Sequence, residues 1–325
     1  MDIVILKLVL GLILILVGAN FLIDGASSVA RKFGIPEFVV GLTIVGIGTS
    51  TPEMVVSVIS ALQGKADIAV GNVIGSNIAN ILLILGIVSI ISPVALTKSN
   101  IRKDIPTLLL ATLLLILLGL DSVFYGKTEN IISRIDGLIL FAGFIIFLIY
   151  SFTQKADEDA EDSKESEDDK KQKQLNIYLS IFFILGGFAG LIYGGQLFVG
   201  AGSDLASHLG ASDAFIGITI MAIGTSLPEL AASATAAIKK RGQMALGNIV
   251  GSNIANIFMI LGGSAIITPL TLQNITLVDI IVTVAAAILM YISALTFKKM
   301  ETDRWDGSIF VLCYIGYIVW LITQI

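Results

Sequence analysis

The sequence has very little of what a soluble enzyme or a soft-ligand metalloprotein needs. It contains one cysteine, Cys313, and one histidine, His208, in 325 residues. A single cysteine excludes an intramolecular disulfide, and these two side chains are too few for a zinc or copper site. Charged residues make up only 14%, against roughly 25% in an average soluble domain. Outside the repeated segments described below, we find no nucleophile with a base, no phosphate loop and no redox centre, so we expect neither an enzyme nor a cofactor.

Apolar residues are abundant instead, at 55% of the chain. Runs of about 20 of them recur along the whole length, and each is long enough to cross a hydrocarbon core of roughly 30 Å as a helix. Because every backbone polar group must be satisfied inside lipid, we predict an all-α polytopic membrane protein with the bilayer as its main partner. Hydropathy and turn signals give ten candidate transmembrane helices, at about 3–29, 37–61, 68–93, 104–121, 132–153, 176–205, 213–237, 243–268, 276–296 and 307–324. We interpret the first as a retained helix and not a signal peptide.

A polar linker divides these spans into two groups of five. Residues 154–175 are rich in acids, lysine, serine and glutamine, and nine acids lie between Asp157 and Asp169. Such a composition predicts a solvated tether. It accounts for most of the net charge of −5, which therefore indicates no nucleic-acid partner, and nothing points to an obligate protein partner. The predicted organisation is a first five-helix repeat over 1–153, the linker, and a second five-helix repeat over 176–325.

The two halves are copies. Residues 41–53, GLTIVGIGTSTPE, recur as residues 217–229, GITIMAIGTSLPE, with 9 of 13 positions identical. Residues 71–81 recur as 247–257, with 9 of 11 identical. One ungapped shift, that from Glu53 to Glu229, relates both pairs of segments, and we call it the repeat offset. A half with an odd number of spans must insert its copy upside down, so we predict two inverted-topology repeats.

The distribution of basic residues supports this topology. With the linker in the cytoplasm, eleven lysines and arginines outside the linker fall on the cytoplasmic side and four fall elsewhere. Both termini are then expected outside the cytoplasmic membrane.

Each repeat carries one carboxylate, Glu53 or Glu229, within an apolar span. An ionised carboxylate at mid-membrane depth costs at least roughly 2.5 kcal/mol, so it needs a partner or a wet cavity. The spans around these glutamates contain no lysine, arginine or histidine. The missing positive charge must then come from a bound cation or a proton, and an oxygen-only lining favours hard cations such as Ca²⁺, Na⁺ or Mg²⁺. A protonated structural carboxyl is the alternative for both glutamates.

Pro52 and Pro228 predict broken helices beside the two carboxylates. A proline removes one backbone donor, which frees carbonyls near residues 48 and 49 and near 224 and 225. Broken helices at mid-membrane depth are common at the ion sites of secondary transporters.

A second pair of segments adds polar side chains at helical spacing. Asn72, Ser76 and Asn80 follow one another at i, i+4 and predict one polar stripe, and Asn248, Ser252 and Asn256 predict its copy. The asparagines Asn72, Asn77, Asn248 and Asn253 can equally be interhelical hydrogen-bond donors. Gly71, Gly75, Gly247 and Gly251 have the spacing that lets membrane helices approach closely, which is more often packing than function.

These four motifs resemble the paired alpha repeats of the cation/Ca²⁺ exchanger superfamily, most closely its prokaryotic sodium/calcium exchangers. The likeness covers the whole chain. The resemblance implies a secondary antiporter that exchanges Ca²⁺ for Na⁺ by alternating access, with both ions as transported substrates. Carried over by motif position, the implied ion ligands are Glu53, Glu229, Thr49, Thr225, Ser76, Ser252, Asn80, Asn256, Ser50, Ser226 and the carbonyls near Gly46 and Ala222. The first and sixth spans resemble the family's sliding gating pair.

One departure from the family leaves alternatives open. Some relatives have an aspartate at one of the two central positions occupied here by Asn80 and Asn256. With both neutral, the Na⁺ stoichiometry and any role of H⁺ or K⁺ are not fixed, and Ca²⁺/H⁺ or K⁺-dependent exchange is the alternative. A cation channel could use the same oxygens, but it does not need an internal inverted repeat.

Overall fold

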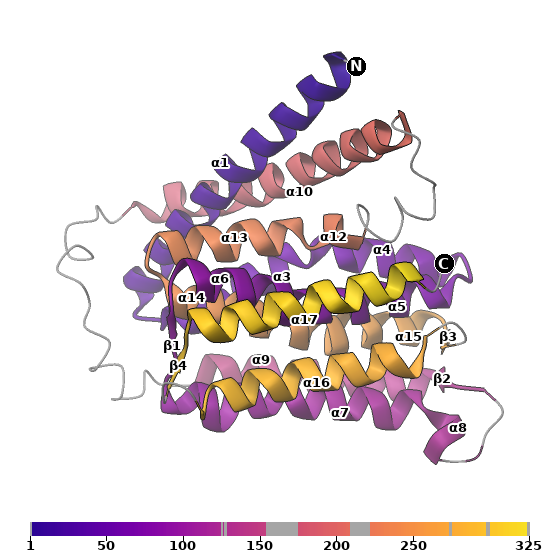
Figure 1. Cartoon of the computed structure of the whole chain (residues 1–325). Helices are drawn as coiled ribbons and strands as arrows, with labels where there is room; N and C mark the ends of the chain where they lie inside the picture. The colour runs from indigo at the N-terminus through magenta and orange to yellow at the C-terminus, as the bar shows by residue number, and fades with distance from the viewer. Residues whose placement is uncertain are drawn as a thin grey trace.

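The computed structural model describes residues 2–124, 126, 129–153, 175–208, 222–272, 275–296 and 300–323, and it is mainly helical (Figure 1). Residues 154–174 of the linker, residues 217–221 of the second repeated motif, and Lys298 and Lys299 lie outside these ranges. The long uninterrupted helices are α1 (Asp2–Phe33), α7 (Ile105–Gly119), α9 (Arg134–Thr153), α10 (Ile177–His208), α16 (Leu277–Ser293) and α17 (Arg304–Thr323).

The repeated motifs form the interrupted helices. After α2 (Glu37–Val40), the first motif runs through the π-helical turn η1 (Gly41–Val45) and α3 (Gly46–Thr49) into α4 (Thr51–Leu62), and the described part of its copy runs through α12 (Ala222–Thr225) into α13 (Leu227–Ile238). The second motif lies in α5 (Ala66–Ile78) and η2 (Ala79–Leu85), which continue into α6 (Gly86–Ile91). Its copy lies in α14 (Gly242–Ala255) and η7 (Asn256–Leu261), which continue into α15 (Gly262–Ile267). Two short pieces remain, η3 (Asn100–Asp104), which leads into α7, and α8 (Asp121–Phe124).

Burial separates a centre from a periphery. In the helix spanning Gly242–Ile267, 83% of the most apolar window is buried, and in Ala66–Ile91 72% is buried, whereas the value for α1, α10 and α17 is 22%. Large apolar side chains are exposed on α1, α9, α10 and α17, which is the surface expected of helices that face lipid. The second repeated motifs therefore form the core of the bundle.

Within the described residues, six helices are long and apolar enough to cross a membrane. The pair Glu37–Thr49 and Thr51–Leu62, bent by 45°, makes a seventh if it counts as one span. The expected positions of the other spans are occupied by shorter apolar helices, such as Leu227–Ile238 and Leu277–Ser293. A helical membrane protein is thus confirmed, and the number ten stays a prediction.

Two short antiparallel ladders join the halves of the chain. β1 (Val94–Ala95) pairs with β4 (Glu301–Thr302), with Val94 opposite Thr302. β2 (Ile131–Ile132) pairs with β3 (Leu270–Thr271), with Ile132 opposite Leu270. The ladders lie at opposite ends of the bundle (Figure 1). Each ladder ties residues from one half to residues from the other.

Helices α1 and α10 cross one face of the bundle side by side (Figure 1). Glycines permit their close contact: a Cβ on Gly18 would lie 2.8 Å from the Leu191 nitrogen, and one on Gly187 would lie 2.6 Å from the Leu22 nitrogen. Backbone thus packs on backbone, which is the arrangement that small residues allow in membranes.

The glycines of the second motif behave differently in the two halves. A Cβ on Gly247 would overlap the Phe38 carbonyl oxygen, and one on Gly251 would overlap the Leu42 carbonyl oxygen, so the predicted close approach is confirmed there. Around Gly75 nothing among the described residues lies within 4 Å of the Cβ position. The residues equivalent to Phe38 and Leu42 in the second half, 214 and 218, lie outside the described ranges, so the prediction is untested for Gly71 and Gly75.

Gly251→Ala should therefore destabilise the protein, because the new methyl group must displace the η1 backbone. We expect a loss of about 1–3 kcal/mol, measured by thermal or denaturant unfolding in detergent. Gly263→Ala on the adjoining helix α15 is the matched control, since no described atom lies within 4 Å of its Cβ position. It should leave stability unchanged or raise it slightly. Equal effects of the two substitutions would contradict the packing argument.

Candidate cation site

The two helix breaks place the carboxylates. α3 ends at Ser50, whose φ of −78° and ψ of 8° leave the helical region, and Pro52 lies in the first turn of α4. Ser226 has nearly the same angles, −87° and 6°, and Pro228 lies in the first turn of α13. The predicted breaks are confirmed, and each proline begins a new helix, where its missing N–H costs nothing. Glu53 and Glu229 therefore stand at helix N-termini, whose dipoles favour negative charge.

Asn248 connects the centres of the two halves. Its side-chain oxygen accepts a hydrogen bond from Thr49 Oγ1 at 3.2 Å, which joins α14 to α3. Its amide nitrogen donates to the Glu229 carbonyl oxygen at 3.3 Å and to Ser233 Oγ at 2.7 Å, which joins α14 to α13. The first turn of α13 is thereby held against the break in the first half.

Asn72 makes the same three contacts from the other half. Its side-chain oxygen accepts from Thr225 Oγ1 at 3.4 Å, and its amide nitrogen donates to the Glu53 carbonyl oxygen at 3.3 Å and to Ser57 Oγ at 3.1 Å. The repeat offset relates the three partners of Asn72 to the three partners of Asn248, one by one. Asn72 and Asn248 therefore act as interhelical hydrogen-bond donors, which was one of the two interpretations of these residues from the sequence.

The carboxylate groups themselves are short of partners. Glu53 and Glu229 are both 0% exposed. Ser50 Oγ donates to Glu229 Oε1 at 3.0 Å, but among the described residues Glu229 Oε2 and both carboxylate oxygens of Glu53 have no hydrogen-bond partner. The two glutamates lie close enough to repel each other electrostatically, and the hydroxyls of Ser76 and Ser226 lie near Glu53. Two acidic side chains are thus buried together with unused lone pairs.

Amide and hydroxyl groups fill the space beside them. Ser226 Oγ donates to Ser76 Oγ at 3.2 Å, and Asn256 Nδ2 donates to Ser76 Oγ at 3.2 Å and to Asn77 Oδ1 at 2.9 Å. Asn256 Oδ1 and both polar atoms of Asn80 lack partners among the described residues, although both side chains are 0% exposed. Buried amides rarely remain unpaired, so these atoms point to an additional ligand.

Main-chain oxygens also reach this region. The Gly46 carbonyl oxygen accepts from Ser252 Oγ at 3.1 Å, from Thr49 Oγ1 at 3.3 Å and from the Ser50 nitrogen at 3.2 Å, so a cation bound there would have to displace at least one of these donors. Ala222 begins α12, so its carbonyl is at the corresponding position of the second half, but its surroundings fall outside the described part of the chain. Asn80 makes no side-chain hydrogen bond among the described residues. Among the remaining predicted residues, Thr225 donates a hydrogen bond to Asn72, and hydrogen bonds or charge proximity connect the others with one another.

Positive charge is missing from this centre. The sequence has no lysine, arginine or histidine in 37–62, 66–91, 222–238 or 242–267. Among the described residues, ion pairs join Lys239 to Asp24 and Arg241 to Glu37, and none of these four residues belongs to the predicted site. No group of three or more histidine, cysteine or acidic side chains gathers among the described residues. The centre therefore offers two carboxylates, several neutral oxygens and no counter-charge.

Sequence reasoning did not identify Ser57 and Ser233, which complete the anchors of Asn72 and Asn248. A signal was available, because both serines follow a motif glutamate by four residues and are related by the repeat offset. The prediction of an interhelical hydrogen-bond donor is confirmed for Asn77, whose amide nitrogen donates to the Asn253 carbonyl oxygen at 3.3 Å and joins the two core helices.

A bundle of apolar helices with lipid-type outer faces and a buried polar centre defines a helical membrane protein. Residues 3–153 and 179–323 match the family described as "Sodium/calcium exchanger protein". The match covers most of both halves, so the chain belongs to this family. The family is one of transporters.

Whole-length relatives agree with this assignment. The chain is 32% identical to sodium/calcium exchanger MaX1 of Methanosarcina acetivorans, over 97% of each chain. It is 33% identical to inner membrane protein YrbG of Escherichia coli, over 97% of this chain and 94% of the other. Among solved structures, it is similar to the sodium-calcium exchanger NCX_Mj soaked with zero Na⁺ and Ca²⁺, with a TM-score of 0.82, 34% identity, and coverage of 99% and 100%.

If the unpaired oxygens form a cation site, cations should stabilise the protein through the two glutamates. Adding Ca²⁺ at about 100 times its dissociation constant should raise the free energy of unfolding by about 2.7 kcal/mol, seen as a higher melting temperature in detergent. The double variant Glu53→Gln, Glu229→Gln should lose this response. In cation-free buffer it should melt no lower than the unaltered protein, because the substitution removes two buried charges. A Ca²⁺ response that survives in the double variant would place the binding elsewhere.

Proposed function

We propose that this chain is a secondary active antiporter that exchanges Ca²⁺ for Na⁺ across the cytoplasmic membrane by alternating access. One observation carries the proposal: two fully buried glutamates have carboxylate oxygens without a partner among the described residues, in a chain of the sodium/calcium exchanger family. MaX1 and NCX_Mj are both named for the exchange of these two ions.

The charge of the site explains why exchange would be obligatory. Glu53 and Glu229 together supply −2, which one Ca²⁺ or at least two Na⁺ can neutralise. Because the same carboxylates serve both ions, occupancy by one excludes the other. An empty site would leave two unpaired charges in a closed, dry intermediate, which is costly, so the protein resists reorienting without cargo.

The proposed ligands are the residues assigned by motif position. Glu53 and Glu229 bind Ca²⁺ through their carboxylates, with the main-chain oxygens of Thr49 and Thr225. The hydroxyls of Ser76 and Ser252 and the carbonyls of Gly46 and Ala222 serve Na⁺. Asn80 and Asn256 complete the centre, and Ser50 and Ser226 line it. The unpaired Oδ1 atoms of Asn80 and Asn256 support this assignment.

The proposed architecture is ten transmembrane helices in two inverted five-helix repeats, 1–153 and 176–325, joined by the linker at 154–175. Two sets of contacts support it. The hydrogen bonds of Asn72 and Asn248 correspond at the repeat offset, and β1 and β3 correspond at the same offset while their ladders lie at opposite ends of the bundle. We place the linker in the cytoplasm and both termini outside, from the distribution of basic residues.

Ca²⁺/H⁺ exchange is the second candidate, because protons could neutralise the same two glutamates when Asn80 and Asn256 are neutral. K⁺-dependent exchange is a further variant. A channel would conduct Ca²⁺ without coupling its flux to a counter-ion.

The first test is uptake of radioactive Ca²⁺ into Na⁺-loaded proteoliposomes diluted into Na⁺-free buffer. We expect uptake that requires internal Na⁺ and falls to background in Glu53→Gln and in Glu229→Gln. Lys65→Gln, which alters an exposed residue, is the matched control and should transport normally. Uptake driven only by an imposed pH gradient would replace Na⁺ by H⁺ in the proposal, and uptake indifferent to both gradients would favour a channel.

Ion competition tests the claim that the site binds a dehydrated ion. Mg²⁺ loses its water reluctantly and prefers strict octahedral geometry, so it should inhibit Ca²⁺ uptake far less than Sr²⁺ does. The measurement is the concentration of each ion that halves uptake. Equal inhibition by Mg²⁺ and Sr²⁺ would argue against a dehydrated site.

A further inference from the structure

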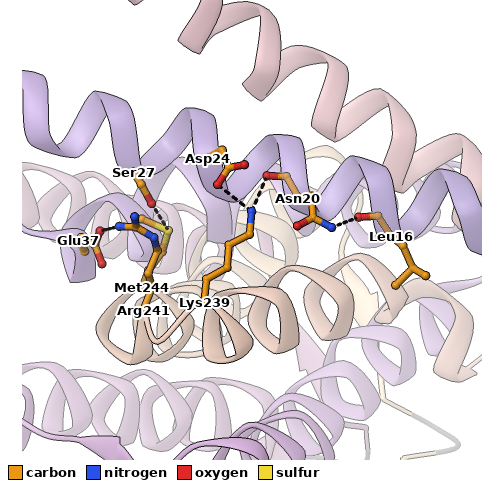
Figure 2. A network of polar contacts seen from close by, with 8 residues as sticks. All are labelled: Leu16, Asn20, Asp24, Ser27, Glu37, Lys239, Arg241 and Met244. Atoms are coloured by element: carbon orange, nitrogen blue, oxygen red, sulfur yellow. Dashed lines mark hydrogen bonds and ion pairs between the residues drawn. The ribbon is translucent and has the colours of Figure 1, made fainter. Parts of the chain in front are cut away.

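A lysine outside the cation site ties α1 to the turn between α13 and α14 (Figure 2). Lys239, which follows the last residue of α13, places Nζ 2.7 Å from Asp24 Oδ1 and donates to the Asn20 carbonyl oxygen at 3.3 Å. Asn20 and Asp24 lie one turn apart on α1, and Ser27, on the same face, contacts Met244 Sδ at 3.8 Å. One polar face of α1 is thereby fastened to this turn.

The same turn is also fastened to α2. The Arg241 guanidinium pairs with the Glu37 carboxylate at the start of α2, and Arg241 is 4% exposed (Figure 2). At the repeat offset, Arg241 corresponds to Lys65 in the first half, and Glu37 corresponds to an aspartate at position 213 in the second half. Opposite charges therefore stand at these positions in both halves, and this pair does not distinguish them.

The Lys239 pair does distinguish the halves. At the repeat offset, Lys239 corresponds to Gln63 and Asp24 corresponds to Gly200. Neither residue is charged, so α10 and the turn between α4 and α5 cannot form the equivalent ion pair. The ion pair can stabilise α1 against its turn, and Gln63 and Gly200 cannot supply the same ion pair between α10 and its turn.

This difference matters if the protein works by alternating access, and to that extent the inference rests on the proposed function. In an inverted repeat, the two halves exchange conformations between the two states. In the opposite state, α1 is therefore expected to be placed relative to the α13–α14 turn in the way that α10 is now placed relative to the α4–α5 turn. An ion pair that forms in only one of these two arrangements stabilises only the state that has that arrangement.

We propose that Lys239 and Asp24 form a one-sided latch that holds α1 in the conformation described here and must break when the site turns to face the other side. The latch sets the resting balance between the two states and does not bind the transported ion. The Lys239 and Asp24 side chains are 21% and 42% exposed, so solvent screens the pair. Pairs of this kind shift an equilibrium by about two- to five-fold, which suits a latch that opens in every cycle.

The test measures hydrogen exchange along residues 20–33 of the full-length protein in lipid nanodiscs. Lys239→Gln and Asp24→Asn should each speed exchange there by about two- to five-fold, and the charge-reversed pair Asp24→Lys, Lys239→Asp should restore the original rate. Lys65→Gln, which removes a lysine from the corresponding turn of the other half, is the matched control and should change nothing. Unchanged exchange in both single variants, or single-variant effects that the reversed pair does not correct, would overturn the latch.

Transport by the same variants separates this inference from the proposed function. In proteoliposomes with known sidedness, the single variants should shift the half-saturating Ca²⁺ concentration in opposite directions on the two faces, because the competent fraction rises on one face and falls on the other. Parallel shifts on both faces, or none, would also overturn the latch. Absence of Na⁺-driven Ca²⁺ uptake in the unaltered protein would instead remove the proposed function, while the hydrogen-exchange result would still decide whether the ion pair restrains α1.

Discussion

Two carboxylates share a dry interior without a basic residue to neutralise them, and the rest of the structure is arranged around that constraint. Burial of Glu53 and Glu229 is unfavourable unless charge, hydrogen bonds or both are supplied. Hydrogen bonding meets only part of the need, because Ser50 reaches one oxygen of Glu229 and the Glu53 oxygens have no such contact among the described residues. The rest of the stabilisation must come from positive charge, which an exchanger obtains from the cation that it transports.

The scaffold holds this unfavourable pair by rigid, repeated contacts. Asn72 and Asn248 each bind the carbonyl oxygen of a glutamate, a serine one turn further on and a threonine of the opposite half. The carboxylates are therefore positioned through their own backbones, and their side chains are left available. Peripheral helices contribute little to this centre: α1 and α10 pack mainly on each other through glycines, and most of their surface faces outward.

Much of this centre was predictable from sequence, and for physical reasons. A charge within an apolar span is expensive enough to mark a site, and its duplication with a neighbouring proline located the breaks at Ser50 and Ser226. The i, i+4 spacing correctly placed the polar side chains of the two core helices on the inside. Family resemblance predicted the fold and the ligand class, and the family assignment is confirmed.

The pairing of side chains across the halves was not predictable, because it depends on how distant helices cross. Ser50 donates to a Glu229 carboxylate oxygen, whereas its copy Ser226, which lies near Glu53, donates to the Ser76 hydroxyl, so the two copies do not share every hydrogen bond. Asn256, and its copy Asn80, lie in the π-helical segments η7 and η2, which a 3.6-residue period does not reveal. The contact between Lys239 and Asp24 joins residues 215 positions apart, and charge alone did not single it out.

Equilibrium binding tests the central claim most directly, since it asks whether one set of oxygens serves both ions. Ca²⁺ is titrated calorimetrically into the purified protein, first without Na⁺ and then at rising Na⁺ concentrations. Our account predicts a single Ca²⁺ per chain whose apparent affinity falls steeply as Na⁺ increases, because two or more Na⁺ must leave before Ca²⁺ binds. A Ca²⁺ affinity that does not change with Na⁺ would contradict the shared site.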